Sequence, residues 1–360
     1  MAEKKDHCGN LLWRLLATLF AGANVCTVFL LWVCVLSTYL SPAKVPYLHL
    51  MGLAFPFFLV ANVLFFVMWL IFKARYACIP LVGVLSVWGY VMDYCPISGD
   101  SDVADDAVCI LSYNVGGMKA EKLPSLDSLV REVRPDIVCL QECPGSSAAT
   151  DMLQSWQDSL GYNMCKDKSR VTLSRFPFVG KPPVIEFPSK EGGNGTLFNW
   201  VLIGADTVLL ANNHLESNRL TEEDKSEYDQ MIYEHQKEQI RQSGRMISRK
   251  LGNAAVYRGQ QTDSLVSCIK RHDGCSMIFC GDFNDTPISY TFQSLRRRLE
   301  SAYTEKGDGM SFSYNRKLFY VRIDHLFFTP DWECQKCYVD NTVDTSDHYP
   351  LVTYLHRKQK

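Results

Sequence analysis

Apolar residues dominate the first quarter of the chain, in three runs separated by short polar segments. Residues 11–40 include one arginine and no acidic residue, and residues 47–72 include no charged residue. Because a helix needs about 20 mostly apolar residues to cross a bilayer, both runs predict transmembrane helices. The third run, residues 77–92, is uncharged but shorter, and its Trp88 and Tyr90 suit the aromatic belt at a membrane surface.

We therefore expect an N-terminal membrane region over residues 1–95, with three transmembrane helices at about residues 11–40, 48–72 and 77–93 and the lipid bilayer as its partner. Two alternatives stay open from the sequence: two spans followed by an interfacial segment, or a cleaved signal peptide in place of the first span. A signal peptide has an apolar core of only ~7–15 residues, which is shorter than the first run.

Basic residues near the apolar runs predict the orientation of the membrane region. They lie before or within the first run (Lys4, Lys5, Arg14) and between the second and third (Lys73, Arg75), with only Lys44 between the first and second. By the positive-inside rule the N-terminus is cytoplasmic, so three spans leave the rest of the chain on the non-cytoplasmic side, periplasmic or extracellular. Two spans would leave it in the cytoplasm.

After an acidic linker at residues 96–106, the pattern becomes that of an α/β domain over residues 107–360. Apolar runs that end abruptly in polar residues predict buried strands delivering polar groups to one edge of a sheet. Five runs have this form: residues 110–114, 137–142, 209–214, 278–285 and 343–348. A sixth, residues 321–325, carries Asp324 inside its apolar run.

The intervening segments predict helices and further strands. Residues 123–133 form an amphipathic helix opened by Pro124 and ended before Pro135, and residues 150–160 form another. Further elements are expected as strands at residues 171–177, 182–187 and 197–202, one or two charged surface helices at 220–250, a break at Gly252 and Asn253, and a last helix at 264–270.

Six short motifs, SYN, LQE, NHLES, GDFND, IDH and SDHYPL, follow one another over about residues 106–357. In these motifs the chain resembles the endonuclease/exonuclease/phosphatase superfamily, which includes deoxyribonuclease I, exonuclease III, neutral sphingomyelinases and inositol polyphosphate 5-phosphatases. The resemblance implies a four-layer α/β sandwich, with two facing β-sheets flanked by helices and the site at one end, here preceded by the transmembrane region.

The same motifs supply the groups that phosphodiester hydrolysis requires. The enzyme must neutralise the phosphate, aim a water in line with the scissile bond and protonate the departing oxygen. Glu142 is the main candidate metal ligand, with Asn114 beside it and Asp347 from the last strand. Such an all-oxygen set suits Mg²⁺, with Mn²⁺ or Ca²⁺ as substitutes, and in the family the matching glutamate is the principal ligand.

The GDFND motif carries the predicted chemistry of the attacking water. Asp282 resembles the family's aspartate that orients or deprotonates this water, and Asn284 resembles the residue that donates to the phosphate oxygens. A Gly-Asp-x-Asn segment can also be a simple Asx turn. Asp285 is a weaker candidate for the site, and it could simply cap the next turn.

Two histidines complete the predicted site. His348 with Asp324 forms an Asp–His dyad, in which the carboxylate fixes the imidazole tautomer and stabilises its protonated form. His214 resembles the second histidine of deoxyribonuclease-like and sphingomyelinase-like members, as a phosphate ligand or an acid to the leaving group. His325 is expected on the opposite face of its strand and is left out. Arg175 is the candidate phosphate contact.

Charge does not select the substrate. The net charge is −2, and basic residues cluster only at residues 296–298 and in the C-terminal tail, whereas nucleic-acid binders usually display a basic patch. A nuclease is slightly favoured over a sphingomyelinase-like lipid phosphodiesterase. An inositol phosphate phosphatase is less favoured because the Asp-Arg-Ile/Val-Leu signature of that group is missing, and a non-catalytic receptor or scaffold is the remaining alternative.

The pairing of the 14 cysteines also stays open. Cys334 and Cys337 could form a local disulfide or half of a zinc site, and Cys268 with Cys275 could pair across a turn.

The predicted topology can be tested with a reporter fused after Lys360. Three spans place the reporter on the non-cytoplasmic side, measured by protease or labelling accessibility in intact cells. A cytoplasmic reporter would contradict three spans and support two.

Overall fold

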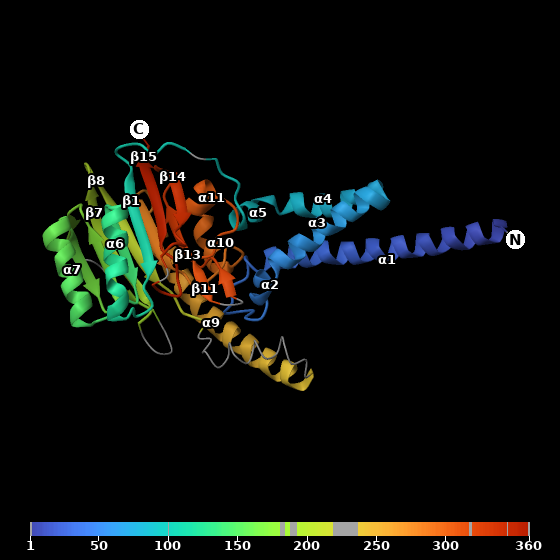
Figure 1. Cartoon of the computed structure of the whole chain (residues 1–360), viewed down its shortest axis with the longest axis horizontal. Helices are drawn as coiled ribbons and strands as arrows, with labels where there is room; N and C mark the ends of the chain where they lie inside the picture. The colour runs from blue at the N-terminus through green and yellow to red at the C-terminus, as the bar shows by residue number, and fades with distance from the viewer. Residues whose placement is uncertain are drawn as a thin grey trace.

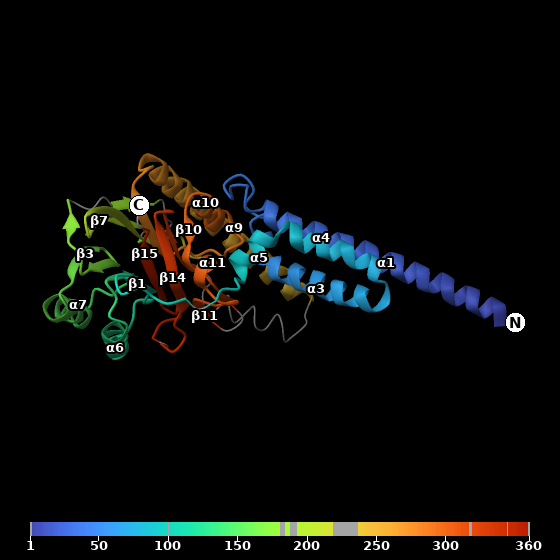
Figure 2. The ribbon, with the colours of Figure 1, turned by 90° about the horizontal axis from the view of Figure 1, so that it is seen from above.

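Two parts of different character follow one another along the chain: a bundle of apolar helices and a block of two stacked β-sheets (Figure 1). The computed structural model describes residues 2–99, 101–180, 184–187, 193–218, 237–316, 319–343 and 345–358. The bundle leads away from the block in both views, with the N-terminus at its far end (Figure 2).

The bundle is built from α1 (Ala2–Leu36), α2 (Leu50–Leu53), α3 (Phe55–Phe72), η1 (Ala74–Ala77), α4 (Cys78–Ser86) and α5 (Trp88–Tyr94). Within the described residues, two helical segments, Trp13–Leu36 and Phe55–Phe72, are long and apolar enough to cross a membrane. The pair Ala74–Ser86 and Trp88–Tyr94 is bent by 64° at Val87, and it gives a third span only if the bent pair counts as one. The number of spans thus remains a prediction.

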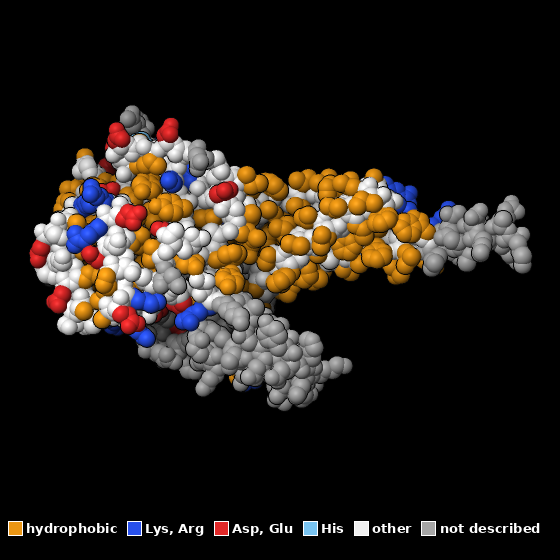
Figure 3. Space-filling model, viewed as in Figure 1, with side chains coloured by type: hydrophobic (Ala, Val, Ile, Leu, Met, Phe, Trp, Pro, Cys, Tyr) orange, Lys and Arg blue, Asp and Glu red, His pale blue; other side chains and the backbone are white. Residues whose placement is uncertain are grey.

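The face of the bundle that is seen in Figure 3 is almost continuously apolar where its side chains are described. Large side chains such as Leu19, Phe57 and Ile71 are mostly exposed. Exposed apolar surface on this scale marks a membrane or protein contact. Inside the bundle, Asn24 in α1 donates a hydrogen bond to Asn62 in α3 (3.2 Å) and accepts one from the Trp69 indole (3.2 Å), so buried polar groups fix how these two helices pack.

The first sheet has the strand order β14-β15-β1-β2-β4-β3. Its strands are β1 (Val108–Asn114), β2 (Ile137–Gln141), β3 (Asn163–Asp167), β4 (Arg170–Ser174), β14 (Trp332–Val339) and β15 (Leu351–Arg357). Only β1 and β2 run parallel; the other neighbours in this sheet are antiparallel.

The second sheet has the order β10-β13-β9-β8-β7-β5, with β6 also paired to β7. Its strands are β5 (Phe178–Val179), β6 (Val184–Glu186), β7 (Gly195–Ile203), β8 (Asp206–His214), β9 (Ser276–Asp282), β10 (Glu300–Ser301) and β13 (Asp324–Phe328). Here β8 and β9 are parallel. A small separate ribbon joins β11 (Tyr314–Arg316) to β12 (Phe319–Val321).

Helices cover the outer face of each sheet (Figure 1). The first sheet packs against α6 (Leu123–Val133) and α7 (Ser147–Leu160), which η2 (Ala120–Lys122) precedes, and the second packs against α9 (Lys237–Arg271) and α10 (Tyr290–Arg296), with α11 (Ala302–Lys306) nearby. The sheets bury a shared core that includes Ile110, Cys139, Val208, Ile278 and Leu326. The predicted sandwich of two facing sheets between helix layers is confirmed.

Strand periodicity determines which side chains reach the space between the sheets. Val108 and Ile110 of β1 face inward, and Val208 and Leu210 of β8 do the same. Because side chains alternate along a strand, Asn114 and His214 continue these inward rows at the last position of their strands. The registers pair Asn114 with Gln141 and His214 with Asp282, so all four strand ends lie at one end of the sandwich.

Two sequence predictions fail at strand and helix boundaries. The predicted strand at residues 343–348 is absent from the described residues there, and β15 starts only at Leu351. The predicted break at Gly252 is also wrong: residues 237–271 form one helix, and the region predicted helical at 220–236 lies outside the described residues. Gly252 and Gly259 lack side chains, which lets Tyr47 and Pro42 of the N-terminal helical bundle pack closely against this helix.

Asp324 also differs from its predicted setting inside a strand. It is the first residue of β13, which runs antiparallel to β9 and pairs Asp324 with Asp282. Starting a strand there, rather than ending one, brings the carboxylate to the same end of the sandwich. The thirteen described cysteines are free thiols, so neither Cys268 with Cys275 nor Cys334 with Cys337 is a disulfide in this structure.

Gly52 approaches the block of β-sheets closely, which allows a test of how the bundle and the block pack against each other. A Cβ at Gly52 would lie 2.0 Å from the carbonyl oxygen of Ile288, whereas nothing lies within 4 Å of a Cβ at Gly22. We expect Gly52→Ala to lower the free energy of unfolding by about 1–3 kcal/mol. Gly22→Ala, the control in α1, should leave it unchanged or slightly higher.

Thermal unfolding of the full chain in detergent micelles measures both variants. Equal melting temperatures for the two would contradict the close packing of α2 on Ile288.

Candidate active site

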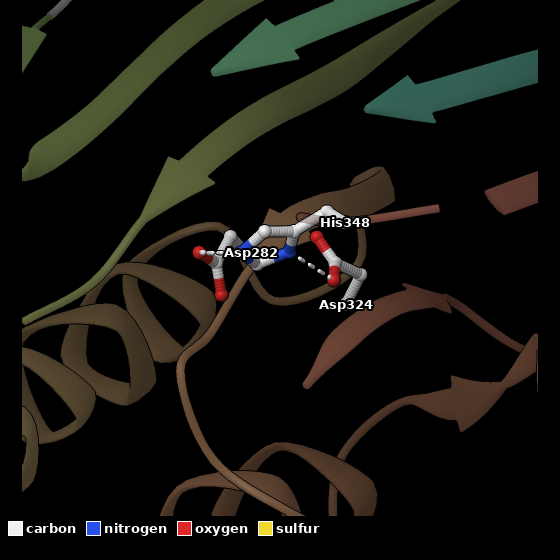
Figure 4. Close-up of side chains that lie close together, drawn as sticks. All are labelled: Asp282, Asp324 and His348. Atoms are coloured by element: carbon white, nitrogen blue, oxygen red, sulfur yellow. Dashed lines mark hydrogen bonds and ion pairs between the residues drawn. The ribbon is translucent and has the colours of Figure 1, made fainter. Parts of the chain in front are cut away.

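The polar strand ends predicted from the sequence meet at one end of the sandwich. They come from β1 (Asn114), the residue after β2 (Glu142), β8 (His214), β9 (Asp282), the start of β13 (Asp324) and the loop before β15 (His348). Figure 4 shows Asp282, Asp324 and His348 facing one another.

Asp282 lies at the centre of the cluster and is 1% exposed. Its Oδ2 accepts hydrogen bonds from Nδ2 of Asn114 (2.9 Å) and Nδ2 of Asn284 (3.0 Å). Nε2 of His348 and Nε2 of His214 lie 3.8 and 3.9 Å from the same oxygen. Burial, together with the charge of Asp324, raises the pKa of the Asp282 carboxyl above its ordinary value.

Asp324 and His348 form the predicted dyad. Nδ1 of His348 lies 2.8 Å from Oδ2 of Asp324, whose backbone N–H donates to Ser313 Oγ (2.9 Å). The carboxylate thus holds the proton on Nδ1 and leaves Nε2 facing Asp282. Burial opposes protonation of the ring, but the charges of Asp324 and Asp282 outweigh it and raise the pKa of His348 to about 10.

Glu142 reaches the cluster by leaving the strand alternation. It follows β2 with φ = 52°, in the left-handed region that non-glycine residues rarely adopt and that occurs most often at functional sites. Its Oε1 lies 3.2 Å from Nε2 of His214 and accepts from Nδ2 of Asn114 (3.2 Å). The neighbouring His214 ring outweighs partial burial and lowers the pKa of Glu142 to about 2. The carboxylate is therefore ionised at neutral pH.

The two asparagines are held by internal hydrogen bonds. Oδ1 of Asn114 accepts from the N–H of Gly116 (2.9 Å), which turns its amide hydrogens toward Glu142 and Asp282. Asn284, with φ = 53°, donates both amide hydrogens within the protein, to Asp282 and to the carbonyl of Leu215 (3.0 Å). Asn284 therefore braces the loops after β8 and β9 against each other.

Two predicted residues lie apart from the centre. Asp347 is paired with Arg316 (3.2 Å) and lies beside Gly116, at the rim near Asn114. The structure does not bring Arg175 to the site. Arg175 follows β4, which runs antiparallel to β2, so it lies next to Asp136 at the opposite end of the sheet from Glu142.

Sequence reasoning missed the buried residues that support the site. Gln141 donates from Nε2 to Oδ1 of Asn212 (2.8 Å), which joins the two sheets directly beneath the cluster. Arg170, at the start of β4 and therefore at the site end, is fully buried and donates to the carbonyl of Gly193 (2.7 Å). Gln141 and Asn212 both occupy inward-facing positions of otherwise apolar strands. A polar residue at such a position was the sequence pattern that could have predicted this bond.

The residues present offer two settings for a metal ion. Asp282, Asp324 and His348 are buried and offer ligand atoms within 4.8 Å of one another, but Nδ1 of His348 is already bonded to Asp324. Mg²⁺ prefers oxygen ligands and keeps several of its waters. The ionised Glu142 carboxylate, 42% exposed and adjacent to Asn114, fits such a cation better.

Comparison with known proteins identifies two matching families. The model described as "Endonuclease/Exonuclease/phosphatase family" matches residues 111–348, and a domain of unknown function matches residues 17–94. No curated protein sequence matches the chain.

Solved structures share the fold of the second part. The human Nocturnin catalytic domain, solved with a bound sulfate anion, is 16% identical with a TM-score of 0.50, covering 72% of this chain and 97% of its own. D. rerio TDP2, solved with a single strand DNA product, is 18% identical with a TM-score of 0.50, covering 70% and 100%. A truncated C. elegans TDP2 is 20% identical with a TM-score of 0.47, covering 71% and 99%.

The burial of Asp282 predicts a stability gain when its charge is removed. The pKa of this carboxyl is higher in the folded than in the unfolded chain. Its ionisation therefore lowers the free energy of unfolding as the pH rises between the two values, here from roughly pH 4 to 6. At pH 7 that loss is complete. We expect Asp282→Asn to raise the free energy of unfolding by about 1–3 kcal/mol, measured in EDTA at pH 7.

Asp273→Asn, at an exposed position, is the matched control and should change the free energy of unfolding by less than about 0.5 kcal/mol. Destabilisation by Asp282→Asn at pH 7 would show that its hydrogen bonds outweigh its burial.

Proposed function

The chain belongs to the endonuclease/exonuclease/phosphatase family, and from that premise we propose that it is a membrane-anchored phosphodiesterase that uses a divalent metal ion and an activated water. The observation that carries this proposal is the position of Asp282, which is in contact with Asn114, His214 and His348 at once. A purely structural buried carboxylate has no need of two histidines, one of them held protonated by a second carboxylate.

Glu142 is the proposed metal ligand. Asn114 beside it faces Glu142 with its Nδ2 and holds its Oδ1 on the N–H of Gly116, so it could ligate a cation only after its amide turns over. Asp347 at the rim could join only once released from Arg316. A bound Mg²⁺, or Mn²⁺ or Ca²⁺ in its place, would neutralise charge on the phosphate. Glu142 suits this role because its low pKa keeps it ionised and its partial exposure leaves room for water ligands.

Asp282 is proposed to orient and deprotonate the attacking water. Its raised pKa makes it a better proton acceptor at neutral pH than an ordinary aspartate, and Asn114 and Asn284 hold the carboxylate still. The protonated His348 lies on the same side and can stabilise the charge that develops on a phosphate oxygen. Asp324 acts through His348 by fixing its tautomer.

His214 is proposed to contact the phosphate or to protonate the leaving oxygen. It lies between Glu142, the proposed metal ligand, and Asp282, the proposed partner of the attacking water. A substrate phosphate bound between these two carboxylates would be within its reach. Asn284 can assist as a donor only by exchanging one of its two internal bonds for a substrate oxygen.

A nucleic acid is the first proposed substrate class, and a phospholipid head group is the second. The first is supported by the shared fold with D. rerio TDP2, which was solved with a single strand DNA product. The second is supported by the apolar helices, which would hold the site close to a bilayer. We also propose that residues 1–95 form the membrane region and that residues 107–360 form the catalytic domain. The catalytic domain would lie on the non-cytoplasmic side.

Activity of the full chain in detergent or nanodiscs tests this function. Bis-p-nitrophenyl phosphate, a single-stranded oligonucleotide and sphingomyelin vesicles are supplied in parallel, each with Mg²⁺ or with EDTA. We expect hydrolysis of at least one substrate in Mg²⁺ and none in EDTA. Glu142→Gln and His348→Asn should each lower kcat/KM by about 100-fold or more.

Glu333→Gln, on the exposed side of β14, is the matched control and should retain full activity. Hydrolysis that survives both EDTA and Glu142→Gln would contradict the metal-dependent mechanism. A chain that hydrolyses none of the three substrates would support a receptor or scaffold instead.

A further inference from the structure

A buried cluster of ionisable side chains joins the membrane region to the loop that follows β9. Asp285 is 4% exposed, and its two carboxylate oxygens lie 3.4 Å from Nε2 of His49 and 3.5 Å from Nε of Arg258. His49 and Arg258 are 5% and 2% exposed. His49 belongs to the segment between the two long apolar helices, and Arg258 belongs to α9. Burial of three ionisable groups costs free energy, so their positions require a reason.

Asp285 is connected to the candidate site on two sides. It directly follows Asn284 and lies three residues after Asp282. Its carbonyl accepts a hydrogen bond from Nε2 of His325 (2.8 Å), and His325 is the neighbour of Asp324 in β13. The turn after β9 and the start of β13 are therefore tied together through Asp285.

Arg258 extends the connection to the second histidine. Its Nη1 donates to the carbonyl of Glu216 (2.9 Å) and to Oδ1 of Asn218 (2.8 Å), in the loop that follows His214. The guanidinium thus lies between the loop after β8 and the loop after β9, and Asp285 fixes it there. His49 closes this arrangement from the membrane side.

Other contacts hold the His49 segment against the same surface. Gly52 approaches the carbonyl of Ile288 too closely for any side chain. Arg297 donates to the carbonyl of Thr38 (3.1 Å), and its guanidinium lies 4.2 Å from the ring centroid of Tyr39. The segment is therefore seated on the block, and His49 is not a loop residue that meets Asp285 by chance.

We propose that His49 is a positioning residue for the hydrolytic site: through Asp285 and Arg258 it fixes the loops that carry Asp282, Asn284 and His214. The membrane region is then a working part of the enzyme as well as its anchor. This inference rests on the function proposed above.

The physical reason is the isolation of Asp285 from water. With His49 present, both carboxylate oxygens face a polar partner and the site loops keep one conformation. With His49 removed, water reaches Asp285 from the membrane side, and the carboxylate can turn away from Arg258. The loops then sample other positions, and Asp282 spends less time where it can hold the attacking water in line with the scissile bond.

Steady-state kinetics of the full chain in nanodiscs tests the proposal. We expect His49→Ala to lower kcat by about tenfold or more while KM changes by less than about twofold, because misplacement affects the reacting groups more than substrate binding. His49→Gln, which keeps an N–H group near the position of Nε2, should recover most of kcat. His356→Ala, which removes a surface pair with Asp106 at the other edge, is the control and should have no effect.

A double-mutant cycle separates positioning from general weakening of the fold. If His49 acts through Asp285, the variant with both His49→Ala and Asp285→Asn should have a kcat close to that of Asp285→Asn alone. Additive losses in log kcat, or a kcat for His49→Ala within twofold of the wild type, would overturn the proposal.

Hydrogen–deuterium exchange decides the structural half independently of any activity. In His49→Ala, amides of residues 281–289 should exchange about tenfold faster, with β1 and β2 unchanged. Unchanged exchange at residues 281–289 overturns the inference even if the wild type proves to be an active phosphodiesterase. Faster exchange with no hydrolysis by the wild type would reject the proposed function and leave the coupling of His49 to this loop established.

Discussion

A carboxylate in a protein interior must find polar partners, and Asp282 takes them from both sheets of the sandwich. Asn114 comes from the first sheet, His214 from the second, and His348 from the loop that leads back to the first. Asp282 can have all of these partners only if the strands end at the same end of the sandwich. The last side chain of each strand must also point into the space between the sheets. Glu142 is the exception that completes the set, since it leaves the alternation through a left-handed backbone conformation.

The position of a side chain could be predicted from the sequence where it depends only on the strand that carries the residue. Apolar runs ending at Asn114, His214 and Asp282 predicted both the strands and the convergence of their ends, because parallel strands deliver their C-termini to one edge. Strand direction was the weaker inference. Arg175 follows an antiparallel strand and so lies at the far end, while Asp324 starts its strand and so lies at the site. These directions follow from sheet order, which depends on contacts distant in sequence.

The contacts between the N-terminal helical bundle and the block could hardly be predicted from the sequence. Gly252 indicated a helix break, yet the missing side chain serves close packing against Tyr47. His49 lies in an apolar stretch, and nothing local indicates that its partner is Asp285. With these contacts in place the apolar helices are continuous with the site, since the turn that carries Asp282 and Asn284 rests on a cluster to which the inter-helix segment contributes. A chain cut after the N-terminal helical bundle would expose Asp285 and Ile288 to water.

Crystals of the full chain grown with Mn²⁺ and measured near the manganese absorption edge test the central claim most directly, namely that these strand ends form one cation-assisted hydrolytic site. The account predicts a single anomalous peak at the Glu142 carboxylate, beside Asn114, with the hydrogen bond between Asp324 and His348 intact. A peak held by Asp282, Asp324 and His348 with that hydrogen bond broken, or Mn²⁺ bound only away from Glu142, would contradict it.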